Sequence, residues 1–202
     1  MRASRLRDYN SRCSRCYLRR EICICPILPT VQTRAEFLIL RHIGEAGRPS
    51  NTGRLVALTL PNSRIVPCGG GERIGISSPD DELLRASGTW LLWPDGTTPR
   101  TDMPELTPPE RVVVLDATWQ QARRLYATVP ALRAMPQLVL PSPHRDRNRL
   151  RDQHRPDGMS TIEAVAAAVA RLEGASVAEP LERLYDEVVR RRTAMRWGFK
   201  PV

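Results

Sequence analysis

The sequence predicts an α/β protein with a parallel sheet, preceded by a small unit that contains four cysteines. Short apolar segments of strand length alternate with segments that carry helix signals, which is the pattern of βαβ units. Residues 112–115, Val-Val-Val-Leu, are apolar at every position, as strands covered on both faces are. The chain has 202 residues, and 41% of them are hydrophobic, which suits one globular domain with a small appendage.

The predicted elements follow one another without an internal repeat. Strands are predicted where short apolar segments are bounded by turn residues: 37–40, 65–66, 90–93, 112–115 and 138–140. Helices are predicted where a cap or acidic residues precede a longer segment: 50–58, 80–84, 118–127, 160–173 and 181–196. The clearest helix start is Ser160-Thr161-Ile162-Glu163, which has the spacing of a capping box. A glycine loop at 69–71 and a proline-rich linker from 94 to 109 separate some of these elements.

Positive charge in this sequence is carried almost entirely by arginine. The chain has 31 Lys+Arg against 22 Asp+Glu, for a formal net charge of +9, and Lys200 is the single lysine. Arginine binds phosphate and stacks on bases, so the excess favours a polyanionic partner, although codon bias explains the scarcity of lysine equally well. Clustering of these residues favours nucleic acid, whereas the C-terminal cluster at 190–200 is best explained as a solvated helix face. The clustered arginines that we expect to contact nucleic acid are Arg15, Arg19, Arg20, Arg145, Arg147, Arg149 and Arg151.

The location follows from the apolar pattern. No apolar segment approaches the roughly 18 residues that a membrane helix needs. The basic N-terminus is not followed by the apolar region of a signal peptide. We therefore expect a cytoplasmic protein without a membrane segment.

Four of the five cysteines lie close together near the N-terminus. Their spacing is C-x2-C-x6-C-x-C, formed by Cys13, Cys16, Cys23 and Cys25. Because the cytosol keeps thiols reduced, a disulfide framework is not expected. Four neighbouring thiolates can hold Zn²⁺ tetrahedrally, and metal binding then folds a segment that has few apolar residues. An iron–sulfur cluster and a chance grouping are the weaker alternatives to a structural zinc knuckle.

One acidic residue follows the most apolar predicted strand. Ligands of open α/β sheets bind beyond the carboxyl ends of the strands, and Asp116 lies there. Two interpretations carry equal weight: Asp116 is the N-cap of the helix that begins near Thr118, or it is a catalytic group. The sequence has no G-x-G-x-x-G after a strand and no G-x4-G-K-[ST], so the usual phosphate-binding loops are not predicted.

Five ordered segments between residues 13 and 174 together resemble the DTW-domain family. The sequence Asp116-Ala117-Thr118-Trp119, followed by Gln-Gln-Ala-Arg, resembles the DTW motif with a small residue between Asp and Thr. The other four segments are the cysteine knuckle, Arg-Pro-Ser-Asn-Thr-Gly-Arg-Leu at 48–55, Trp-Pro-Asp at 93–95 and Ser-Thr-Ile-Glu-Ala at 160–164. The chain departs from the family at Asn148, where many members carry an aromatic residue before the Arg-Leu-Arg segment.

The resemblance implies a fold and an activity. The implied fold is a SPOUT-like α/β domain with a C-terminal knot at residues 31–202, after an Arg-rich N-terminus and zinc knuckle at residues 1–30. The implied activity is that of a tRNA-uridine aminocarboxypropyltransferase, which moves the 3-amino-3-carboxypropyl group of S-adenosylmethionine to N3 of a uridine and releases 5′-methylthioadenosine. Asp116 is then the expected catalytic residue, either as the base for the N3 proton or as the group that orients the cationic sulfonium.

The resemblance also implies contacts for both substrates. The residues expected to bind S-adenosylmethionine are Ser50, Asn51, Thr52, Pro94, Leu115, Thr118, Trp119, Ser160 and Thr161, while Arg123 and Arg124 are expected to meet tRNA. Helix capping is the alternative role for Ser50, Asn51, Thr52, Ser160 and Thr161, and a core position is the alternative for Trp119.

Two other functions fit the residues less closely. One is a SPOUT-type RNA methyltransferase that uses S-adenosylmethionine, and the other is a non-enzymatic RNA-binding protein with a zinc knuckle. The expected partner is tRNA, no protein partner is implied, and we expect a monomer.

Overall fold

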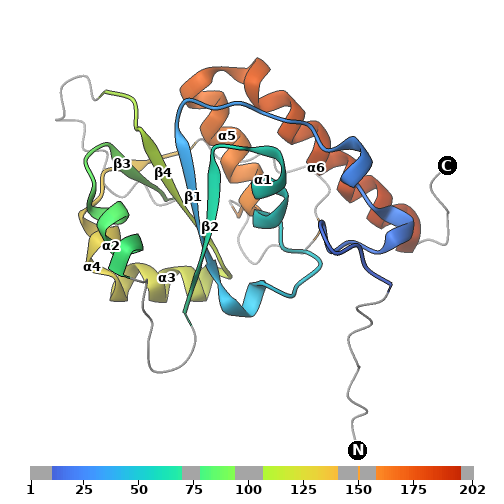
Figure 1. Ribbon diagram of the computed structural model, residues 1–202, viewed down its shortest axis with the longest axis horizontal. Helices are drawn as coiled ribbons and strands as arrows, with labels where there is room; N and C mark the ends of the chain where they lie inside the picture. Colours follow the sequence, from blue (N-terminus) through green and yellow to red (C-terminus); the bar gives the residue numbers. More distant parts are fainter. Residues whose placement is uncertain (1–10, 70–77, 94–106, 141–149, 151–157, 197–202) are drawn as a thin grey trace, which may run out of the picture.

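A parallel sheet forms the centre of the computed structural model, which describes residues 11–69, 78–93, 107–140, 150 and 158–196 (Figure 1). The described strands are arranged in the order β2-β1-β4-β3-β5, and every neighbouring pair is parallel. Their bounds are β1 (Glu36–His42), β2 (Ser63–Cys68), β3 (Thr89–Leu92), β4 (Arg111–Asp116) and β5 (Gln137–Leu138). The predicted α/β class with a parallel sheet is therefore confirmed.

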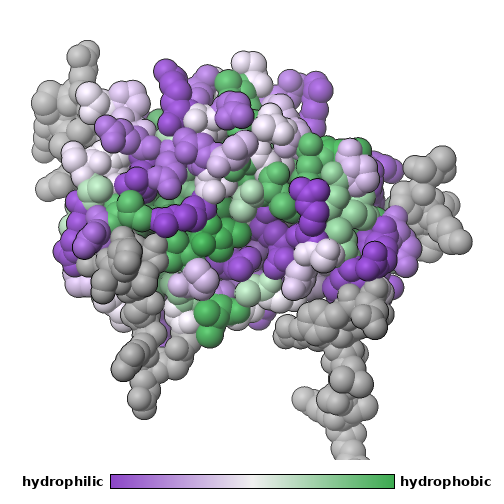
Figure 2. Space-filling view, viewed as in Figure 1, coloured by the Kyte–Doolittle hydropathy of each residue, from purple (hydrophilic) through white to green (hydrophobic). Residues whose placement is uncertain are grey.

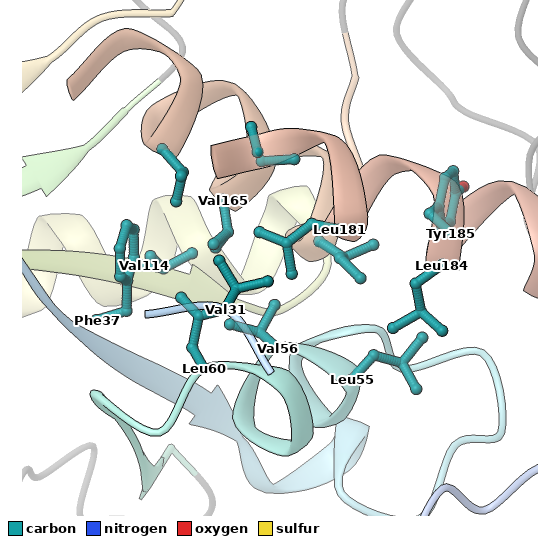
Figure 3. Packing of buried hydrophobic residues seen from close by; sticks show 14 of the residues in the cluster. Val31, Phe37, Leu55, Val56, Leu60, Val114, Val165, Leu181, Leu184 and Tyr185 are labelled. Atoms are coloured by element: carbon teal, nitrogen blue, oxygen red, sulfur yellow. The ribbon is translucent and has the colours of Figure 1, made fainter. Parts of the chain in front are cut away.

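Helices cover both faces of the sheet, because alternate residues of each strand point to opposite faces. On one face lie α1 (Gly53–Thr59), α5 (Thr161–Glu173) and α6 (Ala175–Arg196); on the other lie α2 (Ser78–Arg85), α3 (Trp119–Thr128) and α4 (Pro130–Ala134) (Figure 1). Each face of the sheet has its own hydrophobic core: the first core lies under α1, α5 and α6, and the second lies under α2, α3 and α4. Val112 and Val114 belong to the first core and Val113 belongs to the second. Figure 3 shows Val56 of α1, Val165 of α5 and Leu181 of α6 gathered in the first core.

The sheet changes direction between β1 and β4. The chain leaves β1 through α1 to reach β2 on one side, and it leaves β4 through α3 and α4 toward β5 on the other side. Since such crossovers are right-handed, connections in opposite directions put their helices on opposite faces. The loops after β1 and β4 therefore separate at the carboxyl edge, which is where open α/β sheets bind ligands.

Few large apolar side chains are exposed on the described part of the chain. The face shown in Figure 2 is largely hydrophilic, with apolar patches among the polar side chains. Among the described residues, Ile27 and Ile43 are the large hydrophobic side chains that remain exposed. The described helices include none whose length and hydropathy would suit a transmembrane segment.

The main differences from the predicted elements are one additional helix and the shifted ends of a helix and a strand. The short helix α4 was not predicted, because Pro130 resembles a loop residue although it occupies the first helical turn, where its missing N–H costs little. Helix α6 begins at Ala175 rather than at 181, with Pro180 inside it at the cost of one backbone hydrogen bond. Strand β5 covers two residues and ends before the predicted 140. The glycines at 70–71, residues 94–106 of the predicted linker and most of the chain between β5 and α5 lie outside the described residues.

Candidate active site

Asp116 ends β4 and is 3% exposed. Its Oδ1 accepts a hydrogen bond from Thr161 Oγ1 at 2.7 Å, and its Oδ2 accepts one from Asn51 Nδ2 at 2.6 Å. The N-cap of α3 is Thr118, whose hydroxyl accepts from the backbone N–H of Gln121 at 3.3 Å. The interpretation of Asp116 as a helix cap is therefore wrong. Its carboxylate instead joins three segments that are distant in the sequence.

Asn51 and Thr52 connect the loop after β1 to the other site segments. Asn51 is 5% exposed, and its Oδ1 accepts from the backbone N–H of Arg54 at 3.2 Å while its Nδ2 faces Asp116. The side chain therefore supports the first turn of α1 and holds the carboxylate at the same time. Thr52, 3% exposed, accepts from the backbone N–H of Ile162 at 3.3 Å and so ties α1 to the start of α5. Asn51 therefore contacts the start of the helix, as the capping alternative expects, and it also binds Asp116.

Gly53 was not identified from the sequence, although it packs directly against the site. A Cβ atom at this position would lie 2.3 Å from Oδ2 of Asp116 and 2.5 Å from Cγ. Any larger residue must displace the carboxylate or the helix. The sequence signal that could have identified it is a glycine at the start of a helix. Glycine in a helix is less stable than alanine by about 0.5–1 kcal/mol, so its presence suggests that a side chain does not fit there.

Further charges surround Asp116. Burial raises the pKa of Asp116; the hydrogen bonds from Asn51 and Thr161 and the charge of Arg41 lower it, Glu45 raises it, and the net shift is upward. Arg41 lies opposite Asp116 in the β1–β4 register. Glu45 is 2% exposed and forms an ion pair with Arg48, with 3.2 Å between Oε1 and Nε. Neither Arg41 nor Glu45 was predicted from the sequence, because the strand-end argument was applied to β4 and not to β1.

The N-terminus of α5 lies next to Asp116, because Thr161 is the first residue of this helix. The backbone N–H of Ser160 donates to the carboxylate of Glu163 at 2.8 Å, one half of the predicted capping box. The Ser160 Oγ is buried and has no hydrogen-bond partner among the described residues. Ser50 is half-buried in the loop before Asn51. The structure therefore brings Asn51 and Thr161 to Asp116 and ties Thr52 to the start of α5.

Other expected site residues lie on the opposite face of the sheet or on the surface. Leu115 and Trp119 pack against the core under α3. Trp93 stacks on Trp119, with ring centroids 5.3 Å apart, and on Tyr126, with centroids 4.5 Å apart, so Trp119 is at least in part a core residue. Exposed arginines comprise Arg15, Arg19 and Arg20 near the knuckle and Arg123 and Arg124 on α3. Pro94, Arg145, Arg147, Arg149 and Arg151 lie outside the described residues.

The four clustered cysteines fit a tetrahedral metal site. Their Sγ atoms all lie within 4.8 Å of one another; Cys13 and Cys25 are 3.6 Å apart, and Cys16 and Cys23 are 3.8 Å apart. Four sulfurs at the zinc–thiolate bond length of about 2.3 Å stand roughly 3.8 Å apart. Burial raises the pKa of Cys13, but hydrogen bonds from the backbone of Cys16 and Arg15 and from the thiols of Cys23 and Cys25 outweigh it and bring the pKa to about 6. Burial raises the pKa of Cys23, and it raises that of Cys25 to about 12.

The knuckle packs against the rest of the chain. Cys16, Leu18 and Ile22 are buried in the same core as α5 and α6. Arg191 of α6 donates a hydrogen bond to the backbone carbonyl of Cys23. The same arginine is held by Glu187, with 2.6 Å between Nε and Oε1. The metal site is therefore joined to the body of the fold by both apolar and polar contacts.

Comparison with known proteins gives consistent results. The family model of the DTW domain matches residues 10–193. A "tRNA-uridine aminocarboxypropyltransferase 2" from Drosophila melanogaster is 28% identical over 168 residues, which cover 81% of this chain and 67% of that protein. The protein of the same name from Mus musculus is 30% identical over 171 residues, covering 80% of this chain and 56% of the relative. A "tRNA-uridine aminocarboxypropyltransferase A" from Arabidopsis thaliana is 30% identical over 129 residues, or 56% and 49% of the two chains. No solved structure matches the chain.

Proposed function

Because the chain belongs to the DTW-domain family, we propose that it is a tRNA-uridine aminocarboxypropyltransferase whose donor is S-adenosylmethionine. The observation that carries this proposal is the surroundings of Asp116. Three of the family-like segments meet there: the DTW segment supplies the carboxylate, 48–55 supplies Asn51, and 160–164 supplies Thr161. They meet at the switch point of the sheet, where ligands of this architecture bind.

The proposed reaction is a displacement at carbon. S-adenosylmethionine supplies the 3-amino-3-carboxypropyl group, bonded to a cationic sulfur. A bond forms between uridine N3 and the terminal methylene carbon of that group, the carbon–sulfur bond breaks, and its electron pair leaves with 5′-methylthioadenosine. The N3 proton must also be removed. The protein therefore has two tasks, which are to align the reacting atoms and to accept the proton.

We assign the second task to Asp116. Each oxygen of its carboxylate accepts one hydrogen bond in the structure, which leaves a lone pair on each. Its raised pKa, caused first by burial, makes it a better base than an exposed carboxylate. Asn51 and Thr161 fix the direction of the carboxylate, and Gly53 allows the backbone of α1 to approach it. Orientation of the sulfonium is the second role that the same negative charge supports.

The remaining residues are assigned by their position around this carboxylate. Ser50, Thr52 and the unpartnered hydroxyl of Ser160 offer polar groups to the donor on the α1 and α5 side. On the α3 side we propose contacts from Pro94, Leu115, Thr118 and Trp119. Phosphates of tRNA would be bound by arginines of the knuckle, of α3 and of the basic loop: Arg15, Arg19, Arg20, Arg123, Arg124, Arg145, Arg147, Arg149 and Arg151.

The proposal extends to the rest of the chain. Residues 1–30 are the unit that holds a structural Zn²⁺ through Cys13, Cys16, Cys23 and Cys25, supported by the sulfur separations. Residues 31–202 are the catalytic domain, for which we propose a SPOUT-type arrangement with a C-terminal knot. We further propose that the protein works in the cytoplasm as a monomer.

The test is incubation of the purified protein with S-adenosylmethionine and unmodified tRNA, followed by mass spectrometry of the nucleosides and of the donor products. We expect 3-(3-amino-3-carboxypropyl)uridine together with 5′-methylthioadenosine. S-adenosylhomocysteine and a methylated nucleoside would instead support the methyltransferase alternative. tRNA binding without any donor product would support a non-enzymatic RNA-binding protein.

Substitution of Asp116 by asparagine separates its two proposed roles. The amide can accept from Asn51 and donate to the hydroxyl of Thr161, so the local geometry is kept while the charge is lost. If Asp116 is the base, turnover falls and the dissociation constant for S-adenosylmethionine stays close to that of the parent. If Asp116 orients the sulfonium, that dissociation constant rises. Full activity of the variant would contradict both roles.

A further inference from the structure

Tyr17 has an unusual backbone conformation inside the cysteine knuckle. Its φ is 61°, in the left-handed region that non-glycine residues rarely adopt. The turn is closed by hydrogen bonds from the N–H of Tyr17 to the carbonyl of Cys13 at 3.0 Å and from the N–H of Cys13 to the carbonyl of Leu18 at 2.8 Å. Such a conformation persists only where its surroundings enforce it. Here Tyr17 directly follows Cys16 and donates to the carbonyl of Cys13, and both cysteines are metal ligands in the proposed site. The knuckle therefore fixes the direction of the Tyr17 ring.

The ring of Tyr17 stacks on an arginine of α1. The guanidinium carbon of Arg54 lies 3.6 Å from the ring centroid, which is the geometry of a close cation–π contact. Nη2 of Arg54 donates to the carbonyl of Ala46 at 2.6 Å, and its backbone N–H donates to Oδ1 of Asn51 at 3.2 Å. Arg54 thus holds the segment 46–54 at both ends. This segment consists of the later part of the loop between β1 and α1 and the first two residues of α1.

A continuous set of contacts therefore runs from the metal site to the carboxylate. Tyr17 contacts Arg54, Arg54 binds Asn51, and Asn51 donates to Asp116. We propose that Tyr17 and Arg54 are positioning residues through which the metal-ordered knuckle holds Asn51 against Asp116. This inference rests on the proposed function for its catalytic consequence, whereas the structural coupling itself can be measured without turnover.

The physical basis is the dependence of a small thiolate knuckle on its metal. Binding of Zn²⁺ to four thiolates orders a segment that has few apolar residues of its own, so the knuckle has an ordered and a disordered state. In the ordered state the Tyr17 ring is available to Arg54; in the disordered state it is not. Coupling between two sites requires such a two-state element, and the knuckle supplies it. Loss of metal would then loosen the segment 46–54.

Two variants of Tyr17 separate the ring from the fold of the knuckle. Tyr17→Gly removes the ring but suits the positive φ, since glycine adopts this conformation freely, so the knuckle and its metal are retained. Tyr17→Phe keeps an aromatic ring over the guanidinium and serves as the matched control. The measurement is hydrogen–deuterium exchange of peptides that cover residues 46–54, in full-length protein whose zinc content is quantified.

With zinc at one equivalent in all three proteins, we expect exchange at 46–54 to be about 2- to 30-fold faster in Tyr17→Gly, the range that a lost cation–π contact produces. Tyr17→Phe should match the parent. The turnover number of Tyr17→Gly should fall by a similar factor, with tRNA affinity unchanged. Parental exchange at 46–54 in zinc-loaded Tyr17→Gly would overturn the inference, as would equal acceleration in Tyr17→Phe. Absence of aminocarboxypropyl transfer by the parent would contradict the proposed function alone, because exchange still reports the coupling.

Discussion

A methyl group at position 53 would be a sharp probe of the site, because it enters the space that the Asp116 carboxylate occupies. In Gly53→Ala the new Cβ would stand 2.3 Å from Oδ2, whereas real contacts of Cβ atoms are at least 3.0 Å. Either the carboxylate or the start of α1 must therefore move by several tenths of an ångström or more, and both movements disturb the contact between Asp116 and Asn51. Overpacking of this kind costs about 1–3 kcal/mol. The better helix propensity of alanine offsets about 0.5–1 kcal/mol of that cost.

The expected result is a large loss of activity with a small loss of stability. A displacement approaching 1 Å at a catalytic group lowers the rate by about 100-fold. The assay is nucleoside mass spectrometry of treated tRNA, alongside thermal unfolding. Gly174→Ala is the control: position 174 has open space within 4 Å but a φ of +104°, so alanine is strained there, at the opposite end of α5. It should lose stability and keep activity. If Gly53→Ala kept more than about a third of parental activity, the claim that a fixed Asp116 is required would be refuted.

Other perturbations test the remaining parts of the site. Thr161→Val leaves Oδ1 of Asp116 without its donor, which should cost about 1–3 kcal/mol of unfolding free energy and raise the pKa of Asp116 further; Thr161→Ser should behave as the parent in chemical denaturation. Because folding raises the pKa of Asp116 above 3.8, the folded state binds its proton more tightly, so the free energy of unfolding should fall as pH rises from 3.8 through the raised pKa of the folded state; a pH titration of Asp116→Asn should lack this fall. Cys16→Ser should lose zinc by metal analysis and unfold at lower temperature, since Cys16 is 2% exposed within the core; stoichiometric metal in this variant would exclude the proposed ligand set. Replacing Arg123 or Arg124 by alanine should weaken tRNA binding and reduce the salt slope of log K by about 1, with unchanged thermal stability; an unchanged slope would remove α3 from the tRNA surface.

The sheet could be predicted because its strands are short apolar segments that can be recognised in the sequence alone. Residues 112–115 are apolar throughout, and β4 covers them because a strand between two helical layers is buried on both faces. The position of Asp116 followed from the same argument. The end of β5 and the start of α6 could not be found this way, because a two-residue strand has no period and Pro180 resembles a helix boundary.

The site itself was predicted in part. Asn51, Thr161 and Asp116 were named from the sequence, but the hydrogen bonds that join them depend on how α1 and α5 pack beside β4. Gly53 and Arg54 were missed for the same reason: their roles arise from atoms of other segments, which no local pattern contains. The cap assignment of Asp116 failed because Thr118, two residues later, caps the helix, so that the carboxylate can accept hydrogen bonds from Asn51 and Thr161.

The stack of Trp93, Trp119 and Tyr126 gives the protein an optical signal of its own. Trp119 opens α3 three residues after Asp116, and its ring lies 5.3 Å from that of Trp93 at an interplanar angle of 28°. Indole rings so close share their excited states, and their emission depends on the environment of the outer ring. Because Trp119 follows Asp116 by three residues, we expect a ligand bound against Asp116 to alter that environment. Intrinsic fluorescence and near-ultraviolet circular dichroism should then report such binding in the unlabelled chain.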